Sequence, residues 1–163
     1  MNAQAALREA LNGADSIVTA YLNDLSDADL LVRPVPGANH IAWQLGHLIA
    51  SENAMVGDTC PGVMPALPAG FKEKYTNDTA GSDDRKAFLS KDEYLRLYRE
   101  QRAGALQALE GLKEADFDRP ALERYRHFVP TVGGLFNMQA MHWLMHAGQW
   151  AVVRRKLGHK PIF

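Results

Sequence analysis

The sequence contains a single cysteine, Cys60, among its 163 residues. One thiol cannot form an intrachain disulfide, and it excludes the cysteine clusters that bind structural zinc. No apolar run approaches the roughly 18 residues that a membrane-spanning helix needs. The N-terminal residues lack both the basic and the long apolar segment of a secretory signal peptide. We therefore expect a cytoplasmic protein with no membrane partner.

An excess of charge of one sign is also missing. The chain has 18 Lys and Arg residues against 19 Asp and Glu residues, which gives a formal net charge of −1. Without a basic block or an acidic tail, it lacks the electrostatic footprint of a dedicated nucleic-acid-binding protein. Hydrophobic residues make up 47% of the chain. Its length suits one domain with a sizeable core, so we expect residues 1–163 to form a single domain.

Strand patterns are absent, and so are internal repeats. Apolar residues recur three and four positions apart instead, which is the period of an amphipathic helix. This spacing predicts helices over residues 3–23, 40–57, 90–112 and 131–157. Four helices with one long connection between the second and the third predict an all-α four-helix bundle.

The expected ends of these helices carry recognisable capping residues. Asn39 is a plausible N-cap for the second helix, which we expect to fade at Gly57. Ser90-x-x-Glu93 has the pattern of a capping box that opens the third helix. Thr131 is a suitable N-cap for the fourth helix, and the glycine at 158 lies where a C′ glycine would end it.

The connection over residues 57–89 differs in composition from the rest. It contains three prolines and four glycines, with apolar residues interleaved among them. A segment of this length without regular structure is uncommon in a compact domain, and is often a lid or binding loop. It could equally be an irregular crossover between two helices, and the two roles are compatible.

The fourth helix carries two histidines, His142 and His146, one turn apart. At about 100° per residue they project from the same, mostly apolar, stripe. A buried imidazole without a partner is costly. A metal ion would satisfy both rings. The alternative is that each ring donates to a carbonyl or carboxylate in the core.

The second helix offers two further histidines, His40 and His47, on one face. They lie about 10 Å apart along the axis, so a small site could easily recruit only one of them. His47 lies mid-helix among small residues, whereas the position of His40 in the first turn favours solvent exposure or a capping role. Three neutral imidazoles would leave coordination positions open, as in a catalytic rather than a structural site. An all-nitrogen set suits Zn²⁺ or Ni²⁺.

Three segments together resemble the DinB family of small bacterial metal-binding four-helix bundles. They are NHIAWQLGHL at 39–48, LPAGFKEKYTND at 67–78 and HWLMHAGQWAVVRRKLG at 142–158. The resemblance implies an up-down-down-up bundle with the long crossover between helices two and three. It also implies a metal site made by His47, His142 and His146, followed by the Gly148-Gln149 pair. Characterised relatives include transferases and isomerases that use low-molecular-weight thiols such as mycothiol or bacillithiol. Dimers are common among them.

Three further residues have roles that the sequence leaves open. Glu52 lies among apolar residues, where it could support a ligand, act as a base, or pair with Arg8 or Arg102. Gln149 could orient a ligand or lie on the helix surface. Cys60 could be a thiol near the mouth of the site, although nothing around it indicates a lowered pKa. We expect the tryptophans Trp43, Trp143 and Trp150 to pack in the core, and we assign no role to His127 or His159.

These features lead to a hypothesis about function. The hypothesis is a metal-dependent enzyme, with thiol-dependent S-transfer or isomerisation of small electrophiles as the reaction that the resemblance implies. No catalytic side chain is assigned, and the expected partners are a small-molecule substrate and a second copy in a homodimer. The alternatives are a metal-dependent hydrolase and a non-enzymatic protein that binds a metal or small ligand.

Overall fold

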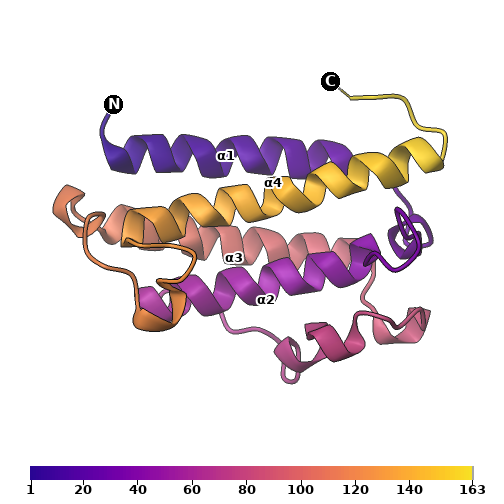
Figure 1. Ribbon diagram of the computed structural model, residues 1–163, viewed down its shortest axis with the longest axis horizontal. Helices are drawn as coiled ribbons and strands as arrows, with labels where there is room; N and C mark the ends of the chain where they lie inside the picture. The colour runs from indigo at the N-terminus through magenta and orange to yellow at the C-terminus, as the bar shows by residue number, and fades with distance from the viewer. Residues whose placement is uncertain (163) are drawn as a thin grey trace.

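The computed structural model describes residues 1–162, and four long helices make up its body (Figure 1). They are α1 (Ala3–Leu22), α2 (Ile41–Thr59), α3 (Lys91–Gly111) and α4 (Val132–Lys156). The described residues contain no strand, only an isolated bridge between Pro120 and Thr131. The predicted all-α four-helix bundle is confirmed.

The chain direction explains the long connection. Helices α1 and α4 run in one direction, and α2 and α3 run in the other (Figure 1). Because α2 and α3 are parallel, the chain must travel back along the bundle between them. It does so over residues 60–90, which we call the crossover segment and which contains the short turns η2 (Lys72–Tyr75), η3 (Asn77–Thr79) and η4 (Arg85–Ala87). The up-down-down-up connection is therefore confirmed.

The start of α2 differs from the prediction. His40, not Asn39, is the N-cap, and its Nδ1 accepts a hydrogen bond of 3.1 Å from the Trp43 backbone N–H. A histidine can cap a helix when the ring nitrogen facing the backbone is unprotonated, which the sequence pattern for N-caps does not include. The helix also continues past Gly57 to Thr59, so the crossover segment begins later than residue 57.

The ends of the other helices agree with their sequence patterns. Ser90 and Glu93 form the complete capping box of α3. Thr131 Oγ1 accepts a hydrogen bond of 3.1 Å from Gly134 N–H and so caps α4. Gly158 adopts a φ of +85°, a left-handed conformation that residues with a side chain rarely take, and it ends α4.

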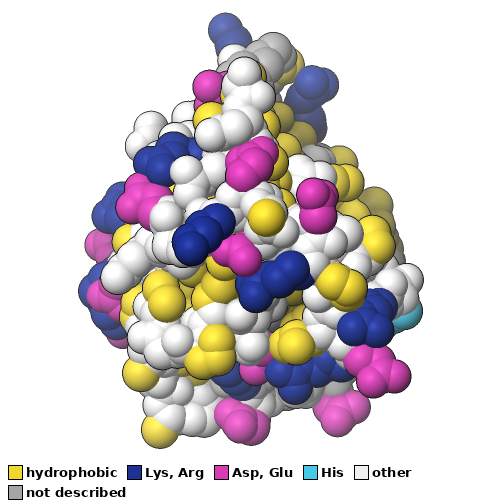
Figure 2. Space-filling view, turned by 90° about the vertical axis from the view of Figure 1, so that its left-hand side faces the viewer, with side chains coloured by type: hydrophobic (Ala, Val, Ile, Leu, Met, Phe, Trp, Pro, Cys, Tyr) yellow, Lys and Arg dark blue, Asp and Glu magenta, His cyan; other side chains and the backbone are white. Residues whose placement is uncertain are grey.

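One end of the bundle carries charges of both signs (Figure 2). On the end of the bundle shown in Figure 2, basic and acidic side chains are interspersed and form no patch of one sign. No helix within residues 1–162 combines the length and the apolar character needed to cross a membrane.

Inside the core, one polar network joins all four helices. Arg102 on α3 reaches Glu52 on α2, with 3.3 Å between Nη2 and Oε2, and Asp15 on α1, with 3.0 Å between Nε and Oδ1. The Trp143 indole on α4 donates a hydrogen bond of 2.7 Å to Glu52 Oε2. Glu52 is completely buried, and burial raises its pKa while the Arg102 charge opposes that rise. The arginine partner left open by the sequence is thus Arg102, whereas Arg8 pairs with Glu110 at the surface.

Replacing Arg102 should therefore destabilise the bundle strongly. In Arg102→Met, the buried Glu52 carboxylate loses its counter-charge, and we expect the free energy of unfolding to fall by about 3–5 kcal/mol. The matched control Arg8→Met breaks the exposed pair of Arg8 on α1 with Glu110 on α3, and it should cost about 1 kcal/mol or less. Urea denaturation followed by circular dichroism measures both losses. Equal losses in the two variants would contradict the role given to the network.

Candidate metal centre

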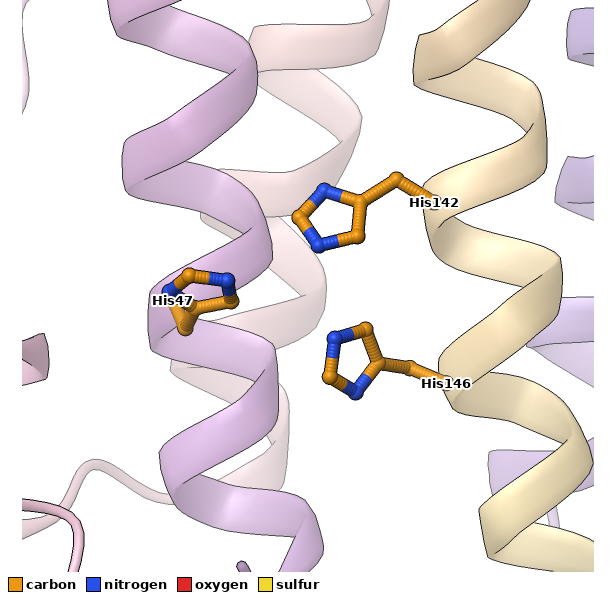
Figure 3. A group of neighbouring side chains, drawn as sticks. All are labelled: His47, His142 and His146. Atoms are coloured by element: carbon orange, nitrogen blue, oxygen red, sulfur yellow. The ribbon is translucent and has the colours of Figure 1, made fainter. Parts of the chain in front are cut away.

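Three histidines from two facing helices meet between α2 and α4. His47 projects from α2, and His142 and His146 project from α4 toward it (Figure 3). One ring nitrogen from each lies within 4.8 Å of the other two. The ring centroids are 5.1 to 5.8 Å apart, and all three side chains are half-buried. The structure thus brings together the three histidines that the sequence singles out, and we call them the histidine triad.

Burial keeps these imidazoles neutral. It is the main cause that lowers the pKa of His142 and of His146 to about 4, and the neighbouring rings of the triad lower both further. Burial also lowers the pKa of His47, with a hydrogen bond to the Tyr75 backbone acting in the opposite direction. A neutral imidazole has a free lone pair, which is the form that binds a metal ion.

The residues present fit a divalent metal ion. Nδ1 of His146 is buried and has no hydrogen-bond partner among the described residues. The alternative raised from the sequence, a carbonyl or carboxylate partner for His142 and His146, is not found within residues 1–162. A tetrahedral zinc ion would place its ligand nitrogens about 3.4 Å apart, given Zn–N bonds of about 2.0–2.1 Å.

His40 does not belong to the triad. Its side chain is fully buried and caps α2 through Nδ1, while Nε2 lies 3.0 Å from the Ser82 carbonyl oxygen. Its ring also packs edge-on against Phe88, with centroids 4.5 Å apart. The predicted capping role is confirmed, and the alternative of solvent exposure is wrong.

The crossover segment forms one wall beside the triad. It packs along α2, where Asn53 Nδ2 donates to the Pro65 carbonyl at 2.9 Å and Trp43 Nε1 donates to Thr79 Oγ1 at 3.1 Å. Phe71 and Tyr75 are both 3% exposed and join the core. These contacts are those of an irregular crossover fixed to its helix, one of the two roles considered from the sequence.

A pair of glutamines joins α2 and α4 one turn from the triad. Gln44 lies three residues before His47, and Gln149 lies three residues after His146. The Trp150 indole donates a hydrogen bond of 2.7 Å to Gln44 Oε1. Gln44 Nε2 in turn donates to Gln149 Oε1 at 2.8 Å.

The indole fixes the orientation of both amides. An indole N–H can only donate, so the oxygen of Gln44 must face Trp150 and its NH₂ must face Gln149. The oxygen of Gln149 is then occupied, and its NH₂ group is left to point away from the core. Sequence reasoning noted Gln149 but missed Gln44. A buried amide within the apolar stretch of α2 was the signal available for it.

Two residues considered for the site lie elsewhere. Cys60 is the C-cap of α2, about 20 Å along the helix axis from His47, and burial raises the pKa of its thiol. The suggestion of a thiol near the mouth of the site is therefore wrong. Glu52 belongs to the core network with Arg102 and Trp143 rather than to the triad. The three tryptophans are buried, as predicted.

The fold and the triad together define a class: an all-α bundle whose facing helices carry a histidine group compatible with metal binding. A sequence model described as the DinB superfamily matches residues 10–150, and the chain belongs to this superfamily. Its fold is similar to that of a crystal structure described as "the conserved protein of locus from Enterococcus faecalis", with a TM-score of 0.74 and 17% identity over 97% of this chain and 99% of the other. A comparison with curated proteins gave no match.

The buried imidazoles predict a pH dependence for the metal-free protein. The unfolded chain takes up protons at histidine near pH 6.5, whereas folded His142 and His146 do so near pH 4. The unfolded state thus binds more protons between these values, and the free energy of unfolding should decrease as the pH falls from about 6.5 to about 4. Urea denaturation after chelator treatment measures this slope.

A double variant, His142→Asn with His146→Asn, supplies the control for this measurement. Other groups titrate in the same window, but the variant keeps them and lacks the two imidazoles. Its slope should be shallower than that of the wild type. Identical slopes would show that the two histidines are protonated in the folded state like exposed ones.

Proposed function

We propose that this protein binds a divalent metal ion, Zn²⁺ or Ni²⁺, through His47, His142 and His146. The observation that carries the proposal is the convergence of three neutral imidazoles, one of which has a buried nitrogen without a partner. Three protein ligands leave coordination positions open for a small molecule. When bound, such an ion lowers the pKa of a coordinated thiol or water and so supplies a nucleophile at neutral pH.

We infer that the reaction is the transfer of a thiol to a small electrophile. The thiol loses its proton to solvent, its sulfur forms a bond to an electrophilic carbon, and the leaving group departs with the electron pair of the bond that it shared with that carbon. No carboxylate of the described residues joins the triad as a base, since Glu52 is engaged with Arg102. The chain's own contribution is therefore to bind and orient the reactants.

Two features beside the triad suit a small, partly apolar substrate. The outward NH₂ group of Gln149 is a hydrogen-bond donor one turn from His146. Met145, the residue before His146, is 61% exposed, and Met141 is 53% exposed one turn earlier. An acceptor atom and an apolar group on one substrate would match these side chains.

Other functions stay open as alternatives. In a metal-dependent hydrolase, water would take the place of the thiol. A protein that only binds a metal or small ligand would use the same triad without turnover. The homodimer and the cytoplasmic location implied earlier remain predictions.

Metal content tests the first part of the proposal. We expect about one metal ion per chain in protein purified without a histidine tag, measured by elemental mass spectrometry. His47→Ala and His142→Ala should each lose most of it, because two imidazoles hold a divalent ion far more weakly than three. The control His127→Ala removes an exposed histidine outside the triad and should keep the wild-type content. A wild type that holds no metal after incubation with zinc or nickel would refute the proposal.

The requirement for a thiol tests the second part. With an aryl halide as model electrophile, the metal-loaded protein should release halide only when a low-molecular-weight thiol is added. His142→Ala should reduce the rate to that of the uncatalysed reaction. Turnover without thiol would favour the hydrolase, and the absence of turnover in a metal-loaded protein would favour the binding protein.

A further inference from the structure

The crossover segment packs directly on α2 at the residue before His47. Gly46 has no side chain, and the Tyr75 ring occupies the space where one would lie. A Cβ atom placed on Gly46 would be 2.1 Å from Tyr75 Cε1 and 2.3 Å from Cδ1. Real Cβ contacts are never so short, so any other residue at 46 would displace the ring. The glycine therefore permits the crossover segment to sit directly against α2.

Tyr75 is held firmly on the side away from Gly46. Its ring is 3% exposed and packs against Phe71, with centroids 4.8 Å apart. Its hydroxyl lies 2.7 Å from that of Tyr94, a fully buried residue of α3. Because the phenol tip is tied to α3, the ring cannot move freely to make room for a larger residue at 46.

The same segment supports the imidazole of His47 directly and through Trp43. The Tyr75 backbone lies close enough to the ring to oppose the lowering of its pKa by burial. On α2 itself, the Trp43 indole stacks on the ring, with centroids 5.0 Å apart and planes only 8° from parallel. That indole is fixed in turn by its hydrogen bond of 3.1 Å to Thr79 Oγ1 in the crossover segment. Both neighbours of the His47 ring thus depend on residues 75–79.

The two histidines of α4 lack such support. Among the described residues, the ring contacts of His142 and His146 are only with each other and with His47. Neither has a hydrogen-bond partner there, and Nδ1 of His146 is buried without one. The histidine triad is therefore asymmetric: within residues 1–162, only His47 has a ring contact outside the triad.

We propose that the crossover segment is the positioning device of the metal centre. Tyr75, seated on Gly46, and Thr79, bonded to Trp43, hold the His47 imidazole in one orientation and one tautomer before metal arrives. His142 and His146 then adjust to the ion. Gly46, Tyr75 and Thr79 are positioning residues, since they act through His47. This inference rests on the proposed metal binding, because it assigns how the site is preorganised for it.

Nitrogen-15 NMR of the imidazoles tests the inference without any metal. In the chelator-treated wild type at neutral pH, His47 should show the two separate ring-nitrogen shifts of a single tautomer. His142 and His146 should show averaged shifts. In Gly46→Ala, the His47 shifts should move toward the averaged values. A His47 ring that averages in the wild type, or stays fixed in Gly46→Ala, would overturn the inference.

Metal affinity gives the second measurement, with a control on the same helix. Gly46→Ala should weaken Zn²⁺ binding about 10–100-fold, the range typical for lost support of a metal ligand. Gly57→Ala introduces the same methyl group in α2, but its nearest neighbour would be 3.6 Å away, an ordinary contact. It should bind Zn²⁺ like the wild type. Equal affinities for all three proteins would overturn the inference.

A double-mutant cycle guards against general unfolding. Tyr75→Leu removes the ring that a methyl group at 46 would strike, so the combined variant should bind Zn²⁺ no more weakly than Tyr75→Leu alone. Additive losses would mean that Gly46 acts independently of Tyr75 and would overturn the inference. Thr79→Val is the milder probe, and it should lower affinity while leaving the far-ultraviolet circular dichroism unchanged. If the wild type binds no metal, the proposed function fails, while the NMR measurement still decides whether His47 is held.

Discussion

The antiparallel contact between α2 and α4 is the constraint on which the rest of the site depends. It sets His47 opposite His142 and His146, and one turn away it sets Gln44 opposite Gln149. The histidine group and the glutamine pair follow the same antiparallel register. Gln44 precedes His47 on α2, and its partner Gln149 follows His146 on α4. A shift of either helix by one residue would turn its polar side chains by about 100° and separate both the histidine group and the glutamine pair.

The crossover segment helps to fix the position of α2 in that register. Since α2 and α3 run in the same direction, the crossover segment must return along the bundle, and it does so while bonded to α2 at several points. The core network adds a second restraint, because one arginine ties the carboxylates of α1 and α2 to α3. Polar contacts thereby restrain α2 from the crossover segment and from α3, in addition to apolar packing that specifies position less sharply.

Sequence periodicity was sufficient for the fold and for part of the site. Caps such as Thr131 and Gly158 act within a few residues, so local patterns found them. The period of a helix also placed His142 and His146 on one face. Periodicity says which face a side chain takes but not what it meets, so Glu52 had two possible arginine partners. For the same reason Gln44 was not predicted, because its side-chain partners Gln149 and Trp150 lie on another helix.

In the hydrogen-bond chain from Trp150 through Gln44 to Gln149, each residue donates to the next, and the first donor is the buried indole. The Asn39 carbonyl oxygen supports the same direction, because it accepts a second hydrogen bond of 2.7 Å from Gln44 Nε2. An indole that only donates and a carbonyl that only accepts therefore turn the Gln44 amide the same way. The chemical group that Gln149 offers to a ligand is thus decided by groups that lie behind it and that no ligand needs to touch.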